Sequence, residues 1–340
     1  MIKGKALLFG LNYAHCKEGQ LKGCINDVDE ISQYISNVLQ IPIDKYTDDV
    51  DIKNTSYDGI IQKLYELAIE SYKNNLEYVW IHYSGHGSFQ KDLSGDEKDG
   101  NDEGLVPSDY EKKGILIDDV INKVLSNFNP KTKILFICDA CHSGTMLDLK
   151  YTWNEKRQSK IDNPKCSVKA KTILVSGCMD NQTSADAWNL LDNKKSIGAL
   201  TASILNVLKR SSQQIYDVFI FVNSVRSELR RNGFSQYPIL SSNFDIANEP
   251  SMVPQHTKSL SIPSKIPNEK PKAPVLFKDI SKTRPDYYES SNTYSPNLRS
   301  NLQSNLQSNL RSTYYKQNSY LYYVSPNNQV ICVPISGYHM

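Results

Sequence analysis

The sequence predicts an α/β fold, a three-layer α/β/α sandwich with a mainly parallel sheet at its centre. Short apolar runs alternate with amphipathic helical segments over residues 5–242, as in sheets whose strands are joined by helical crossovers. Two runs, 78–83 and 133–138, are almost continuously apolar, which is typical of strands buried on both faces. Both runs then change abruptly to small and polar residues. Sheets of this kind bind their ligands at such strand ends.

The first strands and helices are predicted from the spacing of apolar residues and from the proline and capping residues between them. In chain order we expect a strand at 5–13, a helix with apolar positions from Val28 to Leu39, a short strand after Pro42, a helix at 57–72 and the strand at 78–83. Asn26 or Asp27 is well placed to cap the first helix, because short polar side chains accept hydrogen bonds from a helix N-terminus.

The second half continues the same alternation. Residues 91–110 are expected to form a long acidic loop, since acids alternate there with Gly95, Gly100 and Gly104. The later expectations are a helix at 115–128, the strand at 133–138, an exposed connector at 149–171, a strand at 172–176, helices at 198–208 and 215–229, and a strand at 238–242. Loops as long as 91–110 in a compact domain are usually functional or disordered.

From about residue 249 the composition changes to Pro, Ser, Asn, Lys and Tyr, and residues 297–312 repeat a tetrapeptide, Asn-Leu-Arg/Gln-Ser. Such a segment buries too little apolar area to offset its ordering entropy. We therefore expect a largely disordered tail at 249–340, with a transient helix in the repeat or a docked strand at 320–334 as alternatives. After Pro250 the tail carries ten basic and four acidic residues, within a chain of net charge +2. That positive charge is dilute, so we expect no nucleic-acid partner.

Seven cysteines are scattered along the chain, which argues against a disulfide framework and for a reducing, cytoplasmic location. Cys138 and Cys141 match C-x-x-C, but no thioredoxin-like pattern or second ligand pair accompanies them. No apolar stretch of membrane-spanning length and no signal-peptide pattern occurs in the sequence. We therefore expect no membrane association.

The polar residues at the two strand ends include a histidine and a cysteine. His86 follows the first strand, and Cys141 follows the second. If the strands are neighbours in a parallel sheet, imidazole and thiol face each other as base and nucleophile. The amides of Gly87 and Cys141 would then suit an oxyanion hole. Taken alone, His86 is better explained as a turn histidine beside glycines, and it is the pairing with Cys141 at an equivalent strand end that favours catalysis.

These blocks resemble the metacaspases, which are caspase-fold cysteine peptidases. The likeness covers Tyr83-Ser-Gly-His-Gly87 and Asp139-Ala-Cys-His-Ser-Gly144, together with residues 21–27, 102–109 and 176–186. It implies a caspase-like peptidase domain at 1–248, with a large-subunit-like part at 1–150, a connector at 151–171 and a small-subunit-like part at 172–248. It also implies a His86/Cys141 dyad that cleaves after Arg or Lys. We expect a monomer.

The resemblance also assigns a pocket for the substrate side chain that precedes the cleaved bond, the P1 residue. The matching positions here are Cys24, Asp27, Ser84 and Asp139. Two carboxylates suit a cationic P1 side chain and disfavour an acidic one. The modest alternatives are a helix cap for Asp27 and a loop hydrogen bond for Asp139.

Calcium is the second implication of the resemblance. The matching positions are all aspartates: Asp102, Asp118, Asp119 and Asp148. Calcium prefers several oxygen ligands, carboxylates among them, whereas surface acids are more often simply solvated. We expect a Ca²⁺ site here that orders the loops around Cys141.

The leading hypothesis is a calcium-dependent cysteine endopeptidase acting on proteins or peptides with basic P1 residues. The rival is a catalytically silent caspase-like scaffold that acts through its tail. A further expectation is autoprocessing within 149–171, a segment with seven basic residues, namely Lys150, Lys156, Arg157, Lys160, Lys165, Lys169 and Lys171.

Overall fold

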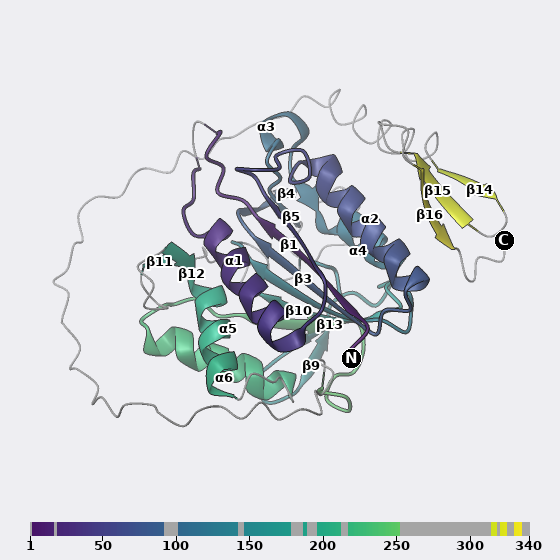
Figure 1. The fold of residues 1–340 in the computed structure, drawn as a ribbon. Helices are drawn as coiled ribbons and strands as arrows, with labels where there is room; N and C mark the ends of the chain where they lie inside the picture. The colour runs from purple at the N-terminus through teal and green to yellow at the C-terminus, as the bar shows by residue number, and fades with distance from the viewer. Residues whose placement is uncertain are drawn as a thin grey trace.

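A computed structural model describes residues 2–16, 19–91, 101–141, 146–177, 196–211 and 217–251, and the backbone of four short strand segments at 186–188, 314–317, 320–324 and 330–334 (Figure 1). Its centre is an eight-stranded sheet in the order β2-β1-β3-β7-β10-β13-β8-β9. The strands are β1 (Gly4–Gly10), β2 (Ile43–Thr47), β3 (Tyr78–Ser84), β7 (Lys133–Asp139), β8 (Tyr151–Trp153), β9 (Ser159–Ile161), β10 (Lys171–Ser176) and β13 (Ile239–Ser242). Strands β2, β1, β3, β7 and β10 run parallel, and β13, β8 and β9 are paired antiparallel.

Helices cover both faces of this sheet, as Figure 1 shows. They are α1 (Cys24–Tyr34), continued by a π-helical turn η1 (Ile35–Leu39), α2 (Tyr57–Lys73), α3 (Tyr110–Lys113), α4 (Asp118–Leu125), α5 (Ala199–Arg210) and α6 (Val218–Arg231). Side chains of α1, α5 and α6 share one buried apolar cluster with alternate residues of the sheet. Side chains of α2 and α4 share a second cluster with the intervening residues. The predicted three-layer α/β/α sandwich is confirmed.

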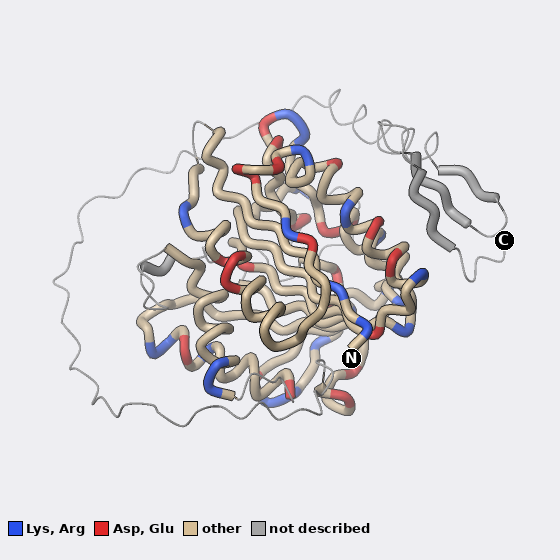
Figure 2. The backbone as a smooth tube through the Cα atoms, in the orientation of Figure 1, with Lys and Arg blue, Asp and Glu red and all other residues tan. Residues whose placement is uncertain are grey.

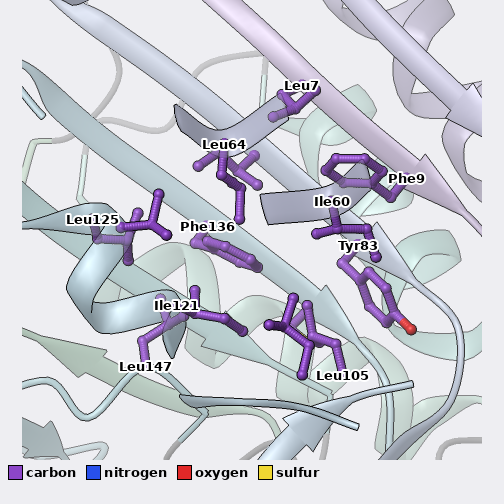
Figure 3. Packing of buried hydrophobic residues seen from close by; sticks show 14 of the residues in the cluster. Leu7, Phe9, Ile60, Leu64, Tyr83, Leu105, Ile121, Leu125, Phe136 and Leu147 are labelled. Carbon is purple, nitrogen blue, oxygen red and sulfur yellow. The ribbon is translucent and has the colours of Figure 1, made fainter. Parts of the chain in front are cut away.

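The strand patterns explain why the two clusters lie back to back. Every residue of β3 is buried, and its side chains alternate: Trp80 belongs to the α1/α5/α6 cluster, while Ile81 and Tyr83 belong to the α2/α4 cluster. Figure 3 shows the latter, with Phe136 of β7 between Leu64 of α2 and Ile121 of α4. Charged residues lie mainly on the outer helices and loops and are few in the central strands (Figure 2).

Smaller elements occupy the segment between β3 and α4. Strands β4 (Gly87–Lys91), β5 (Asn101–Leu105) and β6 (Leu116–Ile117) form an antiparallel sheet. The predicted loop at 91–110 is therefore wrong in part, because its second half is the strand β5 paired with β4. The helix predicted at 115–128 is shorter, since residues 116–117 pair with β5 before α4 begins. Strands β11 (Asp186–Trp188) and β12 (Ser196–Gly198) form a two-stranded ribbon before α5.

Two further expectations need correction. Gly23, not Asn26 or Asp27, is the N-cap of α1. Asp27 lies inside the helix and is fully buried, because tertiary partners bind its carboxylate. The connector at 149–171 is not merely an exposed link: β8 and β9 form a hairpin that joins the sheet through β13. Trp153 anchors this hairpin, since it is buried against Phe219 and donates from Nε1 to Ser242 Oγ at 2.7 Å.

The expected disorder of the tail falls mainly on residues outside the described part of the chain. Within that region the structure describes an antiparallel three-stranded sheet of β14 (Tyr314–Gln317), β15 (Tyr320–Val324) and β16 (Val330–Pro334). Among the described helices, none is both long enough and apolar enough to cross a membrane.

Candidate active site

The two strands singled out by the sequence are neighbours, and their ends are in register. Ser84, the last residue of β3, pairs with Asp139, the last residue of β7. His86 and Cys141 each follow two residues later, so both are delivered to the same edge of the sheet. The backbones touch there: a Cβ on Gly87 would lie only 1.9 Å from the carbonyl oxygen of Cys141. Only glycine therefore fits at position 87.

The imidazole of His86 is oriented by a backbone carbonyl. Its Nε2 lies 2.6 Å from the oxygen of Gly19. A carbonyl only accepts hydrogen bonds, so this contact assigns the proton of the neutral ring to Nε2. The lone pair is then on Nδ1, which becomes the basic nitrogen of the ring.

A pair of buried tyrosines holds the turn that carries His86. The Tyr13 hydroxyl accepts the backbone N–H of His86 at 2.9 Å and donates to the oxygen of Val106 at 2.7 Å. The Tyr83 hydroxyl lies 3.1 Å from that of Tyr13 and 3.0 Å from the oxygen of His86. Burial raises the pKa of both phenols well above its usual value, so both remain protonated hydrogen-bonding groups. The Tyr13 ring also stands 4.8 Å from the His86 ring.

The segment that supplies Tyr13 and Gly19 is itself anchored by a carboxylate. Buried Asp48 accepts the backbone N–H groups of Asn12 and Tyr13 at 2.9 and 2.6 Å. Tyr13 has a φ of 54°, a left-handed conformation that a bulky residue adopts only when its surroundings impose it. Asp48 therefore holds a strained turn that presents Tyr13 to His86.

The predicted pocket acid Asp27 is on α1 and is 0% exposed. Its Oδ2 accepts the hydroxyl of Ser84 at 2.5 Å, and its Oδ1 accepts the backbone N–H of Gly198 at 2.7 Å. Two of the predicted pocket residues, Asp27 and Ser84, are thus directly hydrogen-bonded. Cys24 lies one helical turn before Asp27 and is also buried.

The second pocket acid, Asp139, is held by the first turn of α5. Its Oδ2 accepts the backbone N–H of Thr201 at 3.0 Å and the Thr201 hydroxyl at 2.9 Å. Gly198, the N-cap of α5, lies against both acids, because a Cβ there would be 2.2 Å from Asp139 Oδ2 and 2.8 Å from Asp27 Oδ2. The structure therefore brings both predicted carboxylates to one place, facing the N-terminus of a helix, where negative charge is stabilised.

The four predicted calcium ligands come from three neighbouring segments. Asp102 is on β5, Asp118 and Asp119 open α4, and Asp148 follows β7. The β5–β6 pairing brings the first segments together, and Asn122 of α4 donates to the oxygen of Asp148 at 3.2 Å. Asp118 accepts the backbone N–H groups of Glu103 at 3.2 Å and Asp119 at 2.9 Å.

The donor set has the oxygen chemistry that calcium prefers. Among the residues with described positions, however, no group of three or more His, Cys, Asp or Glu side chains is arranged to hold a metal ion. The segments meet, but the four carboxylates do not form a ready coordination shell.

Sequence reasoning missed the groups that support the site. They are the Gly19 carbonyl, Tyr13, Asp48, Gly198 and Thr201. No sequence motif identifies these residues as part of the site. Within the matching blocks, residues 142–144 and 178–185 lie outside the described residues.

The family model and the curated relatives agree on one family. The family model "Metacaspase, peptidase C14 domain" matches residues 4–150. Metacaspase-1 of Candida glabrata is 32% identical over 71% of this chain and 73% of its own length. Metacaspase-1 of Ajellomyces capsulatus is 30% identical over 70% of this chain and 79% of its own. A crystal structure of a Geobacter sulfurreducens protein aligns with a TM-score of 0.50 and 25% identity, and covers 71% of this chain and 93% of that one.

Proposed function

This chain belongs to the metacaspase family of cysteine-type peptidases, and on that premise we propose that it is a calcium-dependent endopeptidase that cleaves after Arg or Lys, with Cys141 as nucleophile and His86 as base. The observation that carries the proposal is the register of β3 and β7. It delivers His86 and Cys141 to one edge of the sheet, and Ser84 and Asp139 immediately before them.

The proposed chemistry starts from the orientation of His86. With Nε2–H directed at the Gly19 carbonyl, Nδ1 takes the proton of the Cys141 thiol. The thiolate, which is the reactive form of cysteine, attacks the carbonyl carbon of the scissile bond. His86 then returns the proton to the departing amine, and the acyl-enzyme is hydrolysed by water. Backbone amides of Gly87 and Cys141 are the proposed donors to the developing oxyanion.

The preference for a basic P1 residue is supported by the convergence of Asp27 and Asp139 on Gly198. A cation placed between two carboxylates is attracted by both, and the attraction is strong where water is excluded. Asp27 and Asp139 are 0% and 3% exposed. An Asp side chain at P1 would be repelled by the same pair.

Calcium dependence is proposed from the donor chemistry of Asp102, Asp118, Asp119 and Asp148. When bound, Ca²⁺ supplies positive charge that holds acidic segments together. Because no group of three or more His, Cys, Asp or Glu side chains is arranged for a metal ion among the described residues, binding requires a local rearrangement of β5 and the start of α4. Calcium titration followed by thermal unfolding tests this part, with Asp119→Asn as the variant. A melting temperature that Ca²⁺ leaves unchanged in the unmodified chain would rule it out.

Self-cleavage is proposed after Lys165. This residue is exposed and lies in the stretch between β9 and β10, outside any strand. By contrast, Arg157 is bound to Asp217 at 2.7 Å and its guanidinium lies 4.8 Å from the centre of the Phe219 ring. Cleavage after Lys165 would leave β10 paired with β7 and β13, so the two pieces of the chain would stay assembled. Mass spectrometry after Ca²⁺ addition should find the cut, and Lys165→Gln should remove it.

The activity itself is tested with fluorogenic peptides that differ only at P1, carrying Arg, Lys or Asp, with and without Ca²⁺. We expect cleavage of the Arg and Lys peptides alone. A chain that cleaves only the Asp peptide would refute the pocket assignment, and a chain that cleaves none would support the scaffold alternative.

A further inference from the structure

A line of three buried side chains runs behind the pocket acid Asp139. His82 is on β3, Thr201 is in the first turn of α5, and Asp139 ends β7. His82 and Thr201 are both 0% exposed. Nε2 of His82 lies 3.3 Å from Oγ1 of Thr201, which lies 2.9 Å from Oδ2 of Asp139. The three residues belong to three elements that meet only in the folded chain.

The hydrogen bonds in this line have one consistent direction. An ionised carboxylate only accepts, so the single proton of the Thr201 hydroxyl points to Asp139. The Thr201 oxygen then accepts from His82, which places the His82 proton on Nε2. Nδ1 of His82 has no hydrogen-bond partner among the described residues, as expected for the nitrogen that carries the lone pair. Burial lowers the pKa of His82 to about 3, so the ring stays neutral near neutral pH and keeps this role.

We propose that Thr201, backed by His82, is a specificity-determining positioning residue that sets the preference for Arg over Lys at P1. It does so by fixing the plane of the Asp139 carboxylate. Oδ2 accepts both the N–H and the O–H of Thr201. Because the carboxylate is planar, holding Oδ2 in place also holds Oδ1 in place. The inference rests on the proposed function, because it concerns the P1 pocket of that same reaction.

The physical reason lies in the different shapes of the two cations. A guanidinium binds a carboxylate through two parallel N–H groups and needs the carboxylate in a defined plane. The ammonium of Lys is a compact charge with rotatable donors and tolerates a tilted carboxylate. Losing the Thr201 hydroxyl should therefore weaken Arg binding more than Lys binding. Since P1 is held in the ground state and in the transition state alike, the loss should appear in KM rather than in kcat.

The experiment compares Thr201→Val, Thr201→Ser and Ser203→Ala in the full-length chain. Ser203 is a matched control, because it is 0% exposed on the same helix and its hydroxyl has no hydrogen-bond partner among the described residues. For Thr201→Val we expect KM for the Arg peptide to rise about 10-fold, and KM for the Lys peptide to rise by about 3-fold or less. Thr201→Ser should recover most of the Arg preference, and Ser203→Ala should keep all of it.

The rate of Cys141 alkylation and the Arg/Lys ratio of KM together distinguish an effect on the pocket from an effect on the nucleophile. The alkylation rate of Cys141 by iodoacetamide, which has no P1 group, should be the same in all four proteins. Equal losses for Arg and Lys, or an unchanged Arg/Lys ratio in Thr201→Val, would overturn the inference while leaving the proposed function intact. An unmodified chain that cleaves neither peptide overturns both.

If Thr201→Val does not fold, a comparison of His82→Leu with His82→Gln decides. Loss of the Arg preference in His82→Leu and its return in His82→Gln support the inference. Equal Arg/Lys ratios in the two variants overturn it.

Discussion

His86 and Asp139 lie at the ends of neighbouring strands, but they are held from opposite faces of the sheet. Tyr13 and Tyr83, which hold the His86 turn, belong to the apolar cluster shared with α2 and α4. Asp139 is held by Thr201 at the start of α5, next to Ala199 and Leu200 of the other cluster. The proposed base is supported by the first 110 residues, whereas the proposed pocket acid Asp139 is held by a helix that begins after residue 198.

From this division we expect the rate of the proposed chemistry and the choice of substrate to be separately adjustable. Changes around Tyr13 move the imidazole without touching the pocket acids. Changes in the first turn of α5 reorient carboxylates without touching the imidazole. The family match at residues 4–150 covers the dyad and both pocket acids, but not the α5 residues that orient the acids.

The largest expected effect comes from removing either reacting group. Cys141→Ala and His86→Ala should each lower kcat/KM by at least about 1,000-fold for every peptide, because nucleophile and base act as a unit. Steady-state assays with the Arg and Lys peptides measure this loss. Cys166→Ser is the control and should retain activity. Substantial cleavage by Cys141→Ala would place the nucleophile elsewhere.

The next effect separates the pocket from the dyad. Asp139→Asn should lower kcat/KM for the Arg peptide by about 30-fold or more, because a buried guanidinium loses its charged partner. The rate of Cys141 alkylation by iodoacetamide should stay the same. Asp44→Asn, an acid on β2 that pairs with Lys5, is the matched control. Parallel losses of cleavage and of alkylation would mean that the two regions are not independent.

A smaller effect is expected on the other face of the sheet. Tyr13→Phe should lower kcat about 3- to 10-fold and leave the Arg/Lys ratio unchanged, since it removes one hydrogen bond to the backbone of His86, worth about 0.7–1.4 kcal/mol. Tyr78→Phe is the control, because the Tyr78 hydroxyl is buried with no hydrogen-bond partner among the described residues. Stopped-flow or steady-state kinetics give both parameters. A changed ratio in Tyr13→Phe would contradict the separation.

The smallest effect concerns stability, in the helix pair behind the pocket. Burial raises the pKa of Glu228, but its hydrogen bonds with Arg210 and Asn232 and the positive charges of Arg210 and Arg231 together outweigh this and leave the pKa below its usual value of 4.5. A carboxyl with a lowered folded-state pKa stabilises the fold above its unfolded-state pKa, and that contribution is lost as the pH falls through the folded-state value. Glu228→Gln should cost about 1–2 kcal/mol at pH 7, and clearly less at pH 3. Urea unfolding at both pH values measures the difference, and a pH-independent cost would exclude this account.

Much of the frame of the site is predictable from the sequence. Apolar runs in the sequence predict the buried strands, and the polar residues after β3 and β7 predict a functional site at one edge of the sheet. The joint placement of Asp27 and Asp139 agrees with the pocket assignment carried over from the family resemblance. The structure adds that Asp27 points to Ser84 and Gly198 rather than capping its own helix, because tertiary partners outcompete a local preference.

The supporting contacts are not predictable in the same way. The Gly19 carbonyl orients His86 through the backbone of a turn, and no side-chain pattern encodes that. Thr201 meets Asp139 and His82 across 62 and 119 residues of sequence, so only the assembled fold relates them. The β8–β9 hairpin was missed because its strands have three residues each, too few to show alternation, and because charged side chains dominate the segment.

The most direct test of the central claim is covalent labelling with peptidyl chloromethyl ketones that carry Arg or Asp at P1, followed by peptide mapping. We expect a single adduct on Cys141, formed much faster with the Arg reagent and suppressed in both His86→Ala and Asp139→Asn. An adduct on another cysteine, or equal rates with the two reagents, would contradict that claim.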